Sequence, residues 1–252
     1  MHLDAEAISC TLLPHGEHGA IVRLLTRDAG LHALYVRGAR SRKMRPILMA
    51  GNIVAVHAHA RLSGQLAHGS IELVHARASL LQERMSAHAL EWLCGLVGIS
   101  LPEQHPYPAL YDGLNALLSA MEHGARAGHW APALVRFELL LLAEMGFALD
   151  LSSCAATGTE ENLIWVSPKS AQAVSQAAGA PYADKLLALP PFLVSGAHQA
   201  PWADVVAGMR LGGYFLERQL LHGKKAENLL AARNRLLHLF QALAPQDATS
   251  TG

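Results

Sequence analysis

The spacing of the apolar residues changes near residue 78, and this change limits the fold more than any other feature of the sequence. Before that point, turn residues separate short apolar-rich runs, which are typical of β-strands. The five runs cover residues 6–13, 20–26, 31–36, 52–60 and 70–76. After that point, apolar residues recur at every third or fourth position, as on one face of an α-helix. The sequence therefore predicts a strand-rich first part and a helical second part, an α+β protein of several domains.

The first part fits a known small barrel. Five short strands with turn signals between them predict an antiparallel barrel, and the OB-fold is a five-stranded barrel of this kind. The first two runs end in Pro14-His-Gly16 and Asp28-Ala-Gly30, which are strong turn formers. We expect this barrel domain to span residues 1–78.

The second part predicts an all-helical domain over residues 79–245, followed by a flexible tail at 246–252. Pro132 is expected in the first turn of its helix, where a missing N–H costs nothing. Prolines and glycines interrupt residues 151–200, so we expect an irregular insert there. The helices are predicted at about 80–98, 110–123, 132–145, 202–221 and 226–243.

Composition narrows the class of protein. Hydrophobic residues make up 51% of the chain and charged residues 16%, enough to bury a core. The three cysteines are far apart, odd in number and form no CxxC pair, which favours a reducing compartment. The N-terminus carries acids rather than a signal peptide, and the longest apolar stretch, 139–143, is too short to span a membrane. We expect a cytoplasmic protein with no membrane partner.

The basic residues are unevenly distributed, although the net charge of the chain is +0. Residues 1–77 hold nine Lys or Arg against five Asp or Glu, whereas the rest holds eleven against fifteen. Five cations fall within positions 37–45, in the sequence Arg37-Gly-Ala-Arg40-Ser-Arg42-Lys43-Met-Arg45. A loop of this kind can follow a phosphate backbone and gain affinity by counterion release. A solvated turn is the competing interpretation, and the predicted barrel favours nucleic acid.

Aromatic residues are scarce in the barrel region. Tyr35 is the only Phe, Tyr or Trp among residues 1–77. Base stacking on aromatics is a main source of affinity in OB-folds. We therefore expect binding to be mostly electrostatic, weak in sequence preference and strongly salt-dependent.

A second basic zone lies across the last two predicted helices. It could extend a nucleic-acid path or receive an acidic peptide, and a solvated helix face is the alternative that we favour. Its cations are Arg210, Arg218, Lys224, Lys225, Arg233 and Arg235.

Signs of metal or catalytic chemistry are weak. His57 and His59 lie on one side of a predicted strand, but no acid or cysteine stands at ligand spacing, and HExxH is absent. The chain also lacks GxSxG, GxGxxG and GxxxxGK[ST]. We expect no enzyme activity, no cofactor and no metal, and keep a histidine-based metal-dependent hydrolase as a third hypothesis.

Several segments, in order along nearly the whole chain, resemble the RecO family of bacterial recombination mediators. In the first part they are residues 16–30 and 37–40. In the second part they are residues 138–158, 166–170 and 181–190. Each motif is moderately specific, and together they are hard to match otherwise.

This resemblance implies an N-terminal OB-fold, a helical C-terminal domain and no enzymatic turnover. RecO-like proteins bind single- and double-stranded DNA and anneal complementary strands. With RecR they load RecA onto DNA coated by single-strand-binding protein, and the helical domain contacts the acidic C-terminal tail of that coating protein. We therefore expect a role in DNA repair and homologous recombination, at the bacterial nucleoid. The alternative is a protein adaptor with an OB-like barrel that does not bind DNA.

One departure concerns zinc, which some family members hold through four cysteines in the insert. Cys154 stands at the first position, but Thr157 replaces its CxxC partner, and the later pair falls at about Ser175 and Ala178. One ligand of four cannot hold zinc. The insert is therefore expected to be zinc-free, with Cys154 as a small buried apolar residue.

The sequence and the resemblance together nominate two sets of site residues. The DNA-binding set is Arg37, Arg40, Arg42, Lys43 and Arg45, together with Arg23 and Arg27. The candidate set for the acidic tail is Arg210, Lys224, Lys225 and Arg233.

Overall fold

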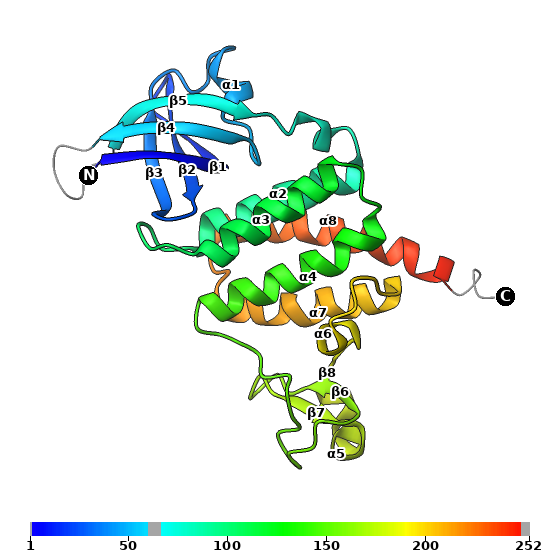
Figure 1. Ribbon diagram of the computed structural model, residues 1–252. Helices are drawn as coiled ribbons and strands as arrows, with labels where there is room; N and C mark the ends of the chain where they lie inside the picture. The colour runs from blue at the N-terminus through cyan, green and yellow to red at the C-terminus, as the bar shows by residue number, and fades with distance from the viewer. Residues whose placement is uncertain (1, 60–66, 248–252) are drawn as a thin grey trace. The chain divides into compact units, whose positions relative to one another are not determined.

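Five strands in the first part of the chain form a closed barrel in the order β1-β2-β3-β5-β4 (Figure 1). The computed structural model describes residues 2–59 and 67–247. The strands are β1 (His2–His15), β2 (Gly19–Thr26), β3 (Gly30–Val36), β4 (Ile53–His59) and β5 (Ala67–His75). The predicted OB-like barrel followed by a helical region is thus confirmed.

The long strand β1 closes one side of the barrel by pairing with two neighbours. Its first half pairs with β4 and its second half with β2, and a bulge between Ser9 and Thr11 bends the strand between the two. All pairs are antiparallel except β3 with β5, which run parallel where the barrel closes. A closed ring of five strands cannot be antiparallel throughout, so one parallel pair is required. The connection after β3 contains the short helix α1 (Met44–Ile47) and leads to β4, which is not a neighbour of β3.

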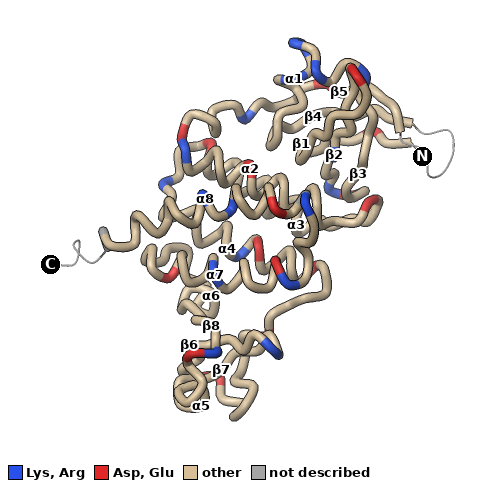
Figure 2. The backbone as a smooth tube through the Cα atoms, turned by 180° about the vertical axis from the view of Figure 1, so that it is seen from behind, with Lys and Arg blue, Asp and Glu red and all other residues tan. Residues whose placement is uncertain are grey.

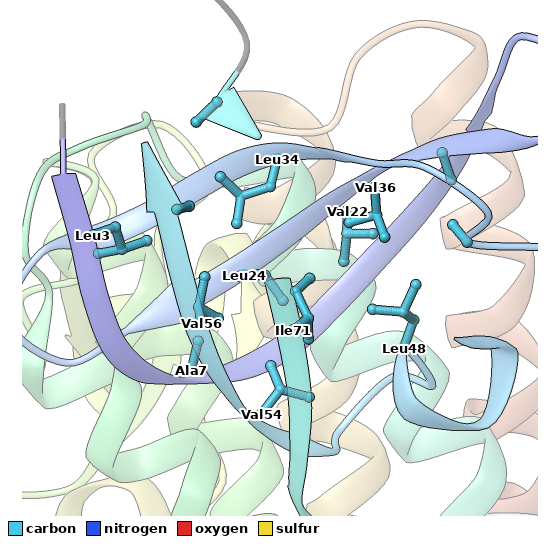
Figure 3. Packing of buried hydrophobic residues seen from close by; sticks show 14 residues of the cluster. Leu3, Ala7, Val22, Leu24, Leu34, Val36, Leu48, Val54, Val56 and Ile71 are labelled. Carbon is cyan, nitrogen blue, oxygen red and sulfur yellow. The ribbon is translucent and has the colours of Figure 1, made fainter. Parts of the chain in front are cut away.

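The inside of the barrel is filled by apolar side chains from every strand (Figure 3). Along β2, Val22 and Leu24 point inward and are fully buried, whereas Arg23 between them points outward. This alternation is typical of a β-strand with one face on the core, and it lies within the run 20–26 that was predicted as a strand. Leu48, which follows α1, is 2% exposed and closes one end of the core.

Two helices complete the first compact unit, residues 1–123. They are α2 (Arg84–Ser100) and α3 (Pro108–Glu122), preceded by the 3₁₀ turn η1 (Ala78–Leu81). Glu83 caps α2, because its carboxylate accepts hydrogen bonds from the backbone N–H groups of Met85 and Ser86 at 2.9 and 2.7 Å. Pro108 opens α3, where its missing N–H is not needed.

Arg77 connects the barrel to α3 although its side chain is only 1% exposed. The guanidinium donates hydrogen bonds to the carbonyl of Gly51 at 2.9 Å and to Asn115 Oδ1 at 2.6 Å. It also donates to Ser119 Oγ at 2.9 Å, and its Nε lies 3.5 Å from Glu122 Oε2. These contacts stabilise the buried charge, although Nε itself makes no hydrogen bond to a described residue.

The second compact unit, residues 124–252, is built on three long helices. They are α4 (Ala127–Glu144), α7 (Trp202–Gln219) and α8 (Lys224–Asp247). The ring of Phe240 in α8 lies 5.8 Å from the ring of Trp130 and 5.2 Å from that of Trp202. Aromatic contacts at this spacing are favourable beyond their buried area.

A small sheet lies within residues 151–200, which the sequence predicted as irregular. Strand β6 (Leu163–Val166) pairs with β7 (Ala173–Ser175) and β8 (Leu187–Ala188), all antiparallel. The short helices α5 (Gln176–Gly179), η2 (Ala180–Lys185) and α6 (Phe192–Ser195) lie between and after these strands. Strands of two to four residues are too short to give a period that a sequence pattern can detect.

Two predicted helix boundaries were wrong. Helix α4 begins at Ala127 rather than at residue 132, so Pro132 lies inside the helix instead of in its first turn. Because proline has no N–H, the helix lacks one backbone hydrogen bond, the one to the Gly128 carbonyl near its N-terminus. Helix α8 runs on to Asp247, past Pro245.

Among the described residues, no helix combines the length and the apolar character that crossing a membrane requires.

Candidate nucleic-acid interface

The five predicted cations lie on the connection between β3 and β4, which we call the basic loop (residues 37–45). Gly38 has φ +69°, a left-handed conformation that glycine adopts at little cost. The backbone N–H of Ser41 donates to the Gly38 carbonyl at 2.9 Å, and Ser41 Oγ accepts from the Met44 N–H at 3.2 Å. These bonds turn the chain tightly from β3 into α1.

Apolar side chains fix which way the basic loop faces. Ala39 is fully buried in the barrel core, and Met44 and Ile47 pack against that core from outside. The side chains between them are left in solvent: Arg37, Arg40, Arg42, Lys43 and Arg45 are all exposed. Figure 2 shows basic segments gathered around α1, at one end of the barrel.

Asn52 holds the far end of this connection from inside the protein. It is fully buried, and its Nδ2 donates to the carbonyls of Pro46 at 2.8 Å and Ile47 at 3.1 Å. Its Oδ1 accepts from the backbone N–H of Arg77 at 2.9 Å. Ser9 Oγ adds a bond to the Leu48 carbonyl at 3.0 Å. The basic loop is thus anchored at one end by buried hydrogen bonds.

The basic loop is also free of acidic partners. Within the part of the chain that the structure describes, none of its five cations forms an ion pair with a carboxylate. Arg40 Nη1 donates to a backbone carbonyl, that of Glu17, at 3.4 Å. Five exposed charges without counterions produce a positive potential that attracts polyanions.

Arg23 and Arg27 lie apart from the basic loop. Arg23 donates to the Gly98 carbonyl and to Glu103 Oε1, the latter at 2.8 Å. Arg27 follows β2 at the opposite end of that strand and forms a two-pronged pair with Asp112, at 2.9 Å for each bond. This pair lowers the pKa of the Asp112 carboxyl. DNA contact by these two arginines stays a prediction, and it would compete with their carboxylates.

The candidate cations of the second unit differ in how exposed they are. Arg210 on α7 and Lys224 at the start of α8 are exposed. Lys225 also lies in α8, and its side chain is outside the described part of the structure. Arg233 is 2% exposed and binds Glu138, with bonds of 2.9 and 2.8 Å to the two carboxylate oxygens. Because Arg233 does not reach the surface, we leave it out of the proposed tail-binding set.

Sequence reasoning missed Asn52 and Arg77, two of the buried polar residues that tie the basic loop to the barrel and α3. In the sequence, Asn52 resembles an ordinary turn residue because it follows a glycine. Arg77 is only one of the nine Lys or Arg residues counted in the first part. Their roles depend on partners far along the chain, such as Asn115 and Ser119 for Arg77. No local spacing signals bonds of that kind.

The insert keeps Cys154 buried, at 2% exposure. Its Sγ accepts a hydrogen bond from the backbone N–H of Ser175 at 3.2 Å, so the thiol has a polar contact that a purely apolar role does not include. Over residues 2–59 and 67–247, no group of three or more His, Cys, Asp or Glu side chains is placed to hold a metal ion.

Comparison with known proteins agrees with this geometry along both parts of the chain. The family model described as Recombination protein O N terminal matches residues 1–77, and that described as Recombination protein O C terminal matches residues 86–228. The DNA repair protein RecO of Rhizobium johnstonii is 41% identical over 254 residues, covering 100% of this chain and 98% of that relative. That of Rhodospirillum centenum is 45% identical over 244 residues, covering 96% of this chain and 95% of that relative.

These matches, together with an OB-like barrel followed by a helical region, place the chain in the class of DNA repair proteins. The chain belongs to the RecO family.

Proposed function

We propose that this protein binds single- and double-stranded DNA through the basic loop and anneals complementary strands. The observation that carries this proposal is the row of five exposed cations without carboxylate partners, held outward by Ala39 and Asn52. Each phosphate that they neutralise releases bound counterions, which favours any nucleic acid regardless of its sequence. Two strands that bind such a surface repel each other less, and this screening assists annealing.

The remaining steps follow the family. We propose that the protein acts with RecR to load RecA onto DNA coated by single-strand-binding protein, and that it has no catalytic turnover of its own. Its helical unit would contact the acidic tail of the coating protein. Arg210, Lys224 and Lys225 are the cations that we keep for this contact. The place of action would be the bacterial nucleoid, where the DNA lies.

The test is fluorescence anisotropy of a labelled single-stranded oligonucleotide, titrated at several salt concentrations. The variant changes Arg40, Arg42, Lys43 and Arg45 to Ala. We expect weaker binding and a flatter salt dependence, since each lost phosphate contact lowers the slope by about 0.7. The control removes four exposed cations elsewhere, by changing Arg84, Arg126, Lys169 and Lys185 to Ala, and should keep the wild-type slope.

Other results would support different proposals. Equal slopes for the wild type and the basic-loop variant would move the DNA site away from the loop. An equal loss in both variants would mean that net charge, and not this loop, determines binding. If the wild type bound no DNA even at low salt, the protein-adaptor hypothesis would replace DNA binding.

A further inference from the structure

Three aromatic rings gather on the outside of the barrel, beside the basic loop. The ring centre of Tyr35 lies 5.8 Å from that of His15 and 5.4 Å from that of His68. Both imidazoles stand nearly perpendicular to the phenol ring, at 79° and 76°. The two histidines are exposed and Tyr35 is partly exposed. We call these three residues the ring cluster; they come from β1, β3 and β5.

Gly19 makes room for this arrangement at the start of β2. A Cβ atom at Gly19 would lie 2.4 Å from both Cε2 and Oη of Tyr35, far closer than atoms can approach. The hydroxyl end of the phenol ring therefore lies directly over the Gly19 backbone. Glycine at this position allows Tyr35 to lie along the barrel surface between the two imidazoles.

The ring cluster and the basic loop are neighbours. Tyr35 and Arg37 are two positions apart, with the core residue Val36 between them, so both point away from the barrel interior. The hydrogen bond from Arg40 to the Glu17 carbonyl holds the loop against the turn after His15. The Glu17 carboxylate is exposed and lies 3.9 Å from His18 Nε2.

We propose that His15, Tyr35 and His68 form a stacking surface for the unpaired bases of a single-stranded nucleic acid. This inference rests on the proposed function, in which the basic loop holds the phosphates of the same strand. Every base has a π face, so aromatic surfaces bind single strands with little sequence preference. Histidine stacks on bases as Phe, Tyr and Trp do. The barrel thus offers more than the electrostatic attraction expected from a region with one tyrosine.

The experiment compares two probes of equal length and charge: labelled oligothymidylate and the same sugar–phosphate chain without bases. The wild type should bind the thymidylate about five- to tenfold more tightly than the abasic chain, as expected for one stacked base. Tyr35→Leu keeps an apolar cover over Gly19 and removes the ring. It should lower the ratio of the two Kd values clearly below that of the wild type, since the central ring is lost, while leaving abasic binding unchanged. Tyr35→Trp keeps a ring and should retain the preference.

Gly19→Ala gives a second variant, which displaces the ring without deleting it and should also reduce the ratio. Circular dichroism melts establish that each variant is folded before its Kd values are compared. Equal wild-type affinity for both probes would overturn the stacking surface and leave the phosphate-binding loop intact. A preference for thymidylate as large as that of the wild type in folded Tyr35→Leu and Gly19→Ala proteins would also overturn it. Absence of binding to both probes would remove the proposed function itself.

Discussion

At the scale of single residues, His32 makes the stability of the barrel depend on pH. It is 5% exposed on β3, where the backbone near Gln104 runs alongside and donates to the Leu31 carbonyl at 2.9 Å. Burial lowers the pKa of His32, because the charged imidazolium loses its hydration. The folded state therefore takes up this proton at a lower pH than the unfolded chain does.

The direction in which pH changes the free energy of unfolding follows from proton linkage. As the pH falls through about 6.5, the ordinary value for histidine, the unfolded chain gains a proton that folded His32 does not accept. The free energy of unfolding should then decrease, by at most about 1.4 kcal/mol per pH unit for this one group. In His32→Leu we expect a smaller decrease than in the wild type, measured by urea unfolding at several pH values between neutral and mildly acidic.

Exposed histidines provide the control for this prediction. The His18 side chain is 86% exposed, so His18→Leu should keep the pH dependence of the wild type. If His32→Leu and the wild type lost stability in parallel on acidification, the buried imidazole would not be the cause.

At the scale of elements, a buried ion pair sets how closely α7 approaches α4 and α8. Glu138 of α4 and Arg233 of α8 meet beneath two glycines of α7. A Cβ at Gly212 would lie 2.6 Å from Glu138 Oε2, and one at Gly213 would lie 2.5 Å from Arg233 Nη1. The two glycines thus leave the space that the charged groups occupy.

Gly212→Ala should lower the free energy of unfolding by about 1–3 kcal/mol, the usual cost of overpacking a core. The added methyl group would push the carboxylate away from Arg233, and a buried charge that loses its partner is costly. Thermal and urea unfolding measure the change.

Gly128→Ala in α4 is the matched control, because a Cβ there meets no atom within 4 Å. There the ordinary helix preference for alanine should leave stability unchanged or raise it. Equal effects at the two glycines would contradict this account.

The elements that the sequence predicts well are those whose burial repeats along the chain. In β2 the alternation of Val22, Arg23 and Leu24 corresponds to inside, outside and inside. Boundaries are harder, because Pro132 suits a helix start as well as the interior position that it occupies. The strands β6, β7 and β8 are too short to show a period at all. Their pairing depends on partners elsewhere in the insert.

At the scale of the whole molecule, the sequence shows where charge is concentrated but not which charges face outward. The basic loop is predictable because its five cations are neighbours in sequence and no acid lies among them. Arg233 also belongs to a group of cations that are close in sequence, yet its side chain is buried. The sequence does not show this, because its partner Glu138 is 95 positions away. The ring cluster is hidden for the same reason, because three strands bring His15, Tyr35 and His68 together.

The same long-range contacts predict which fragment of the chain folds alone. The predicted barrel domain ends at residue 78, whereas the first compact unit extends to residue 123 and includes α2 and α3. A fragment of residues 1–78 contains Arg77 but lacks Asn115, Ser119 and Glu122, which surround its guanidinium. That fragment would also expose the barrel surface that α2 covers, where Arg23 donates a hydrogen bond to the Gly98 carbonyl.

We therefore expect residues 1–123 to unfold in one cooperative transition and residues 1–78 to be much less stable or unfolded. The difference should be several kcal/mol, because a buried arginine without its partners alone costs about 3–5 kcal/mol. Circular dichroism during urea titration of both fragments measures it. In Arg77→Met the long fragment should lose stability, because the carboxylate and amide left behind lose their partner. A short fragment as stable as the long one would show that the barrel needs neither helix, and would restore a domain boundary at residue 78.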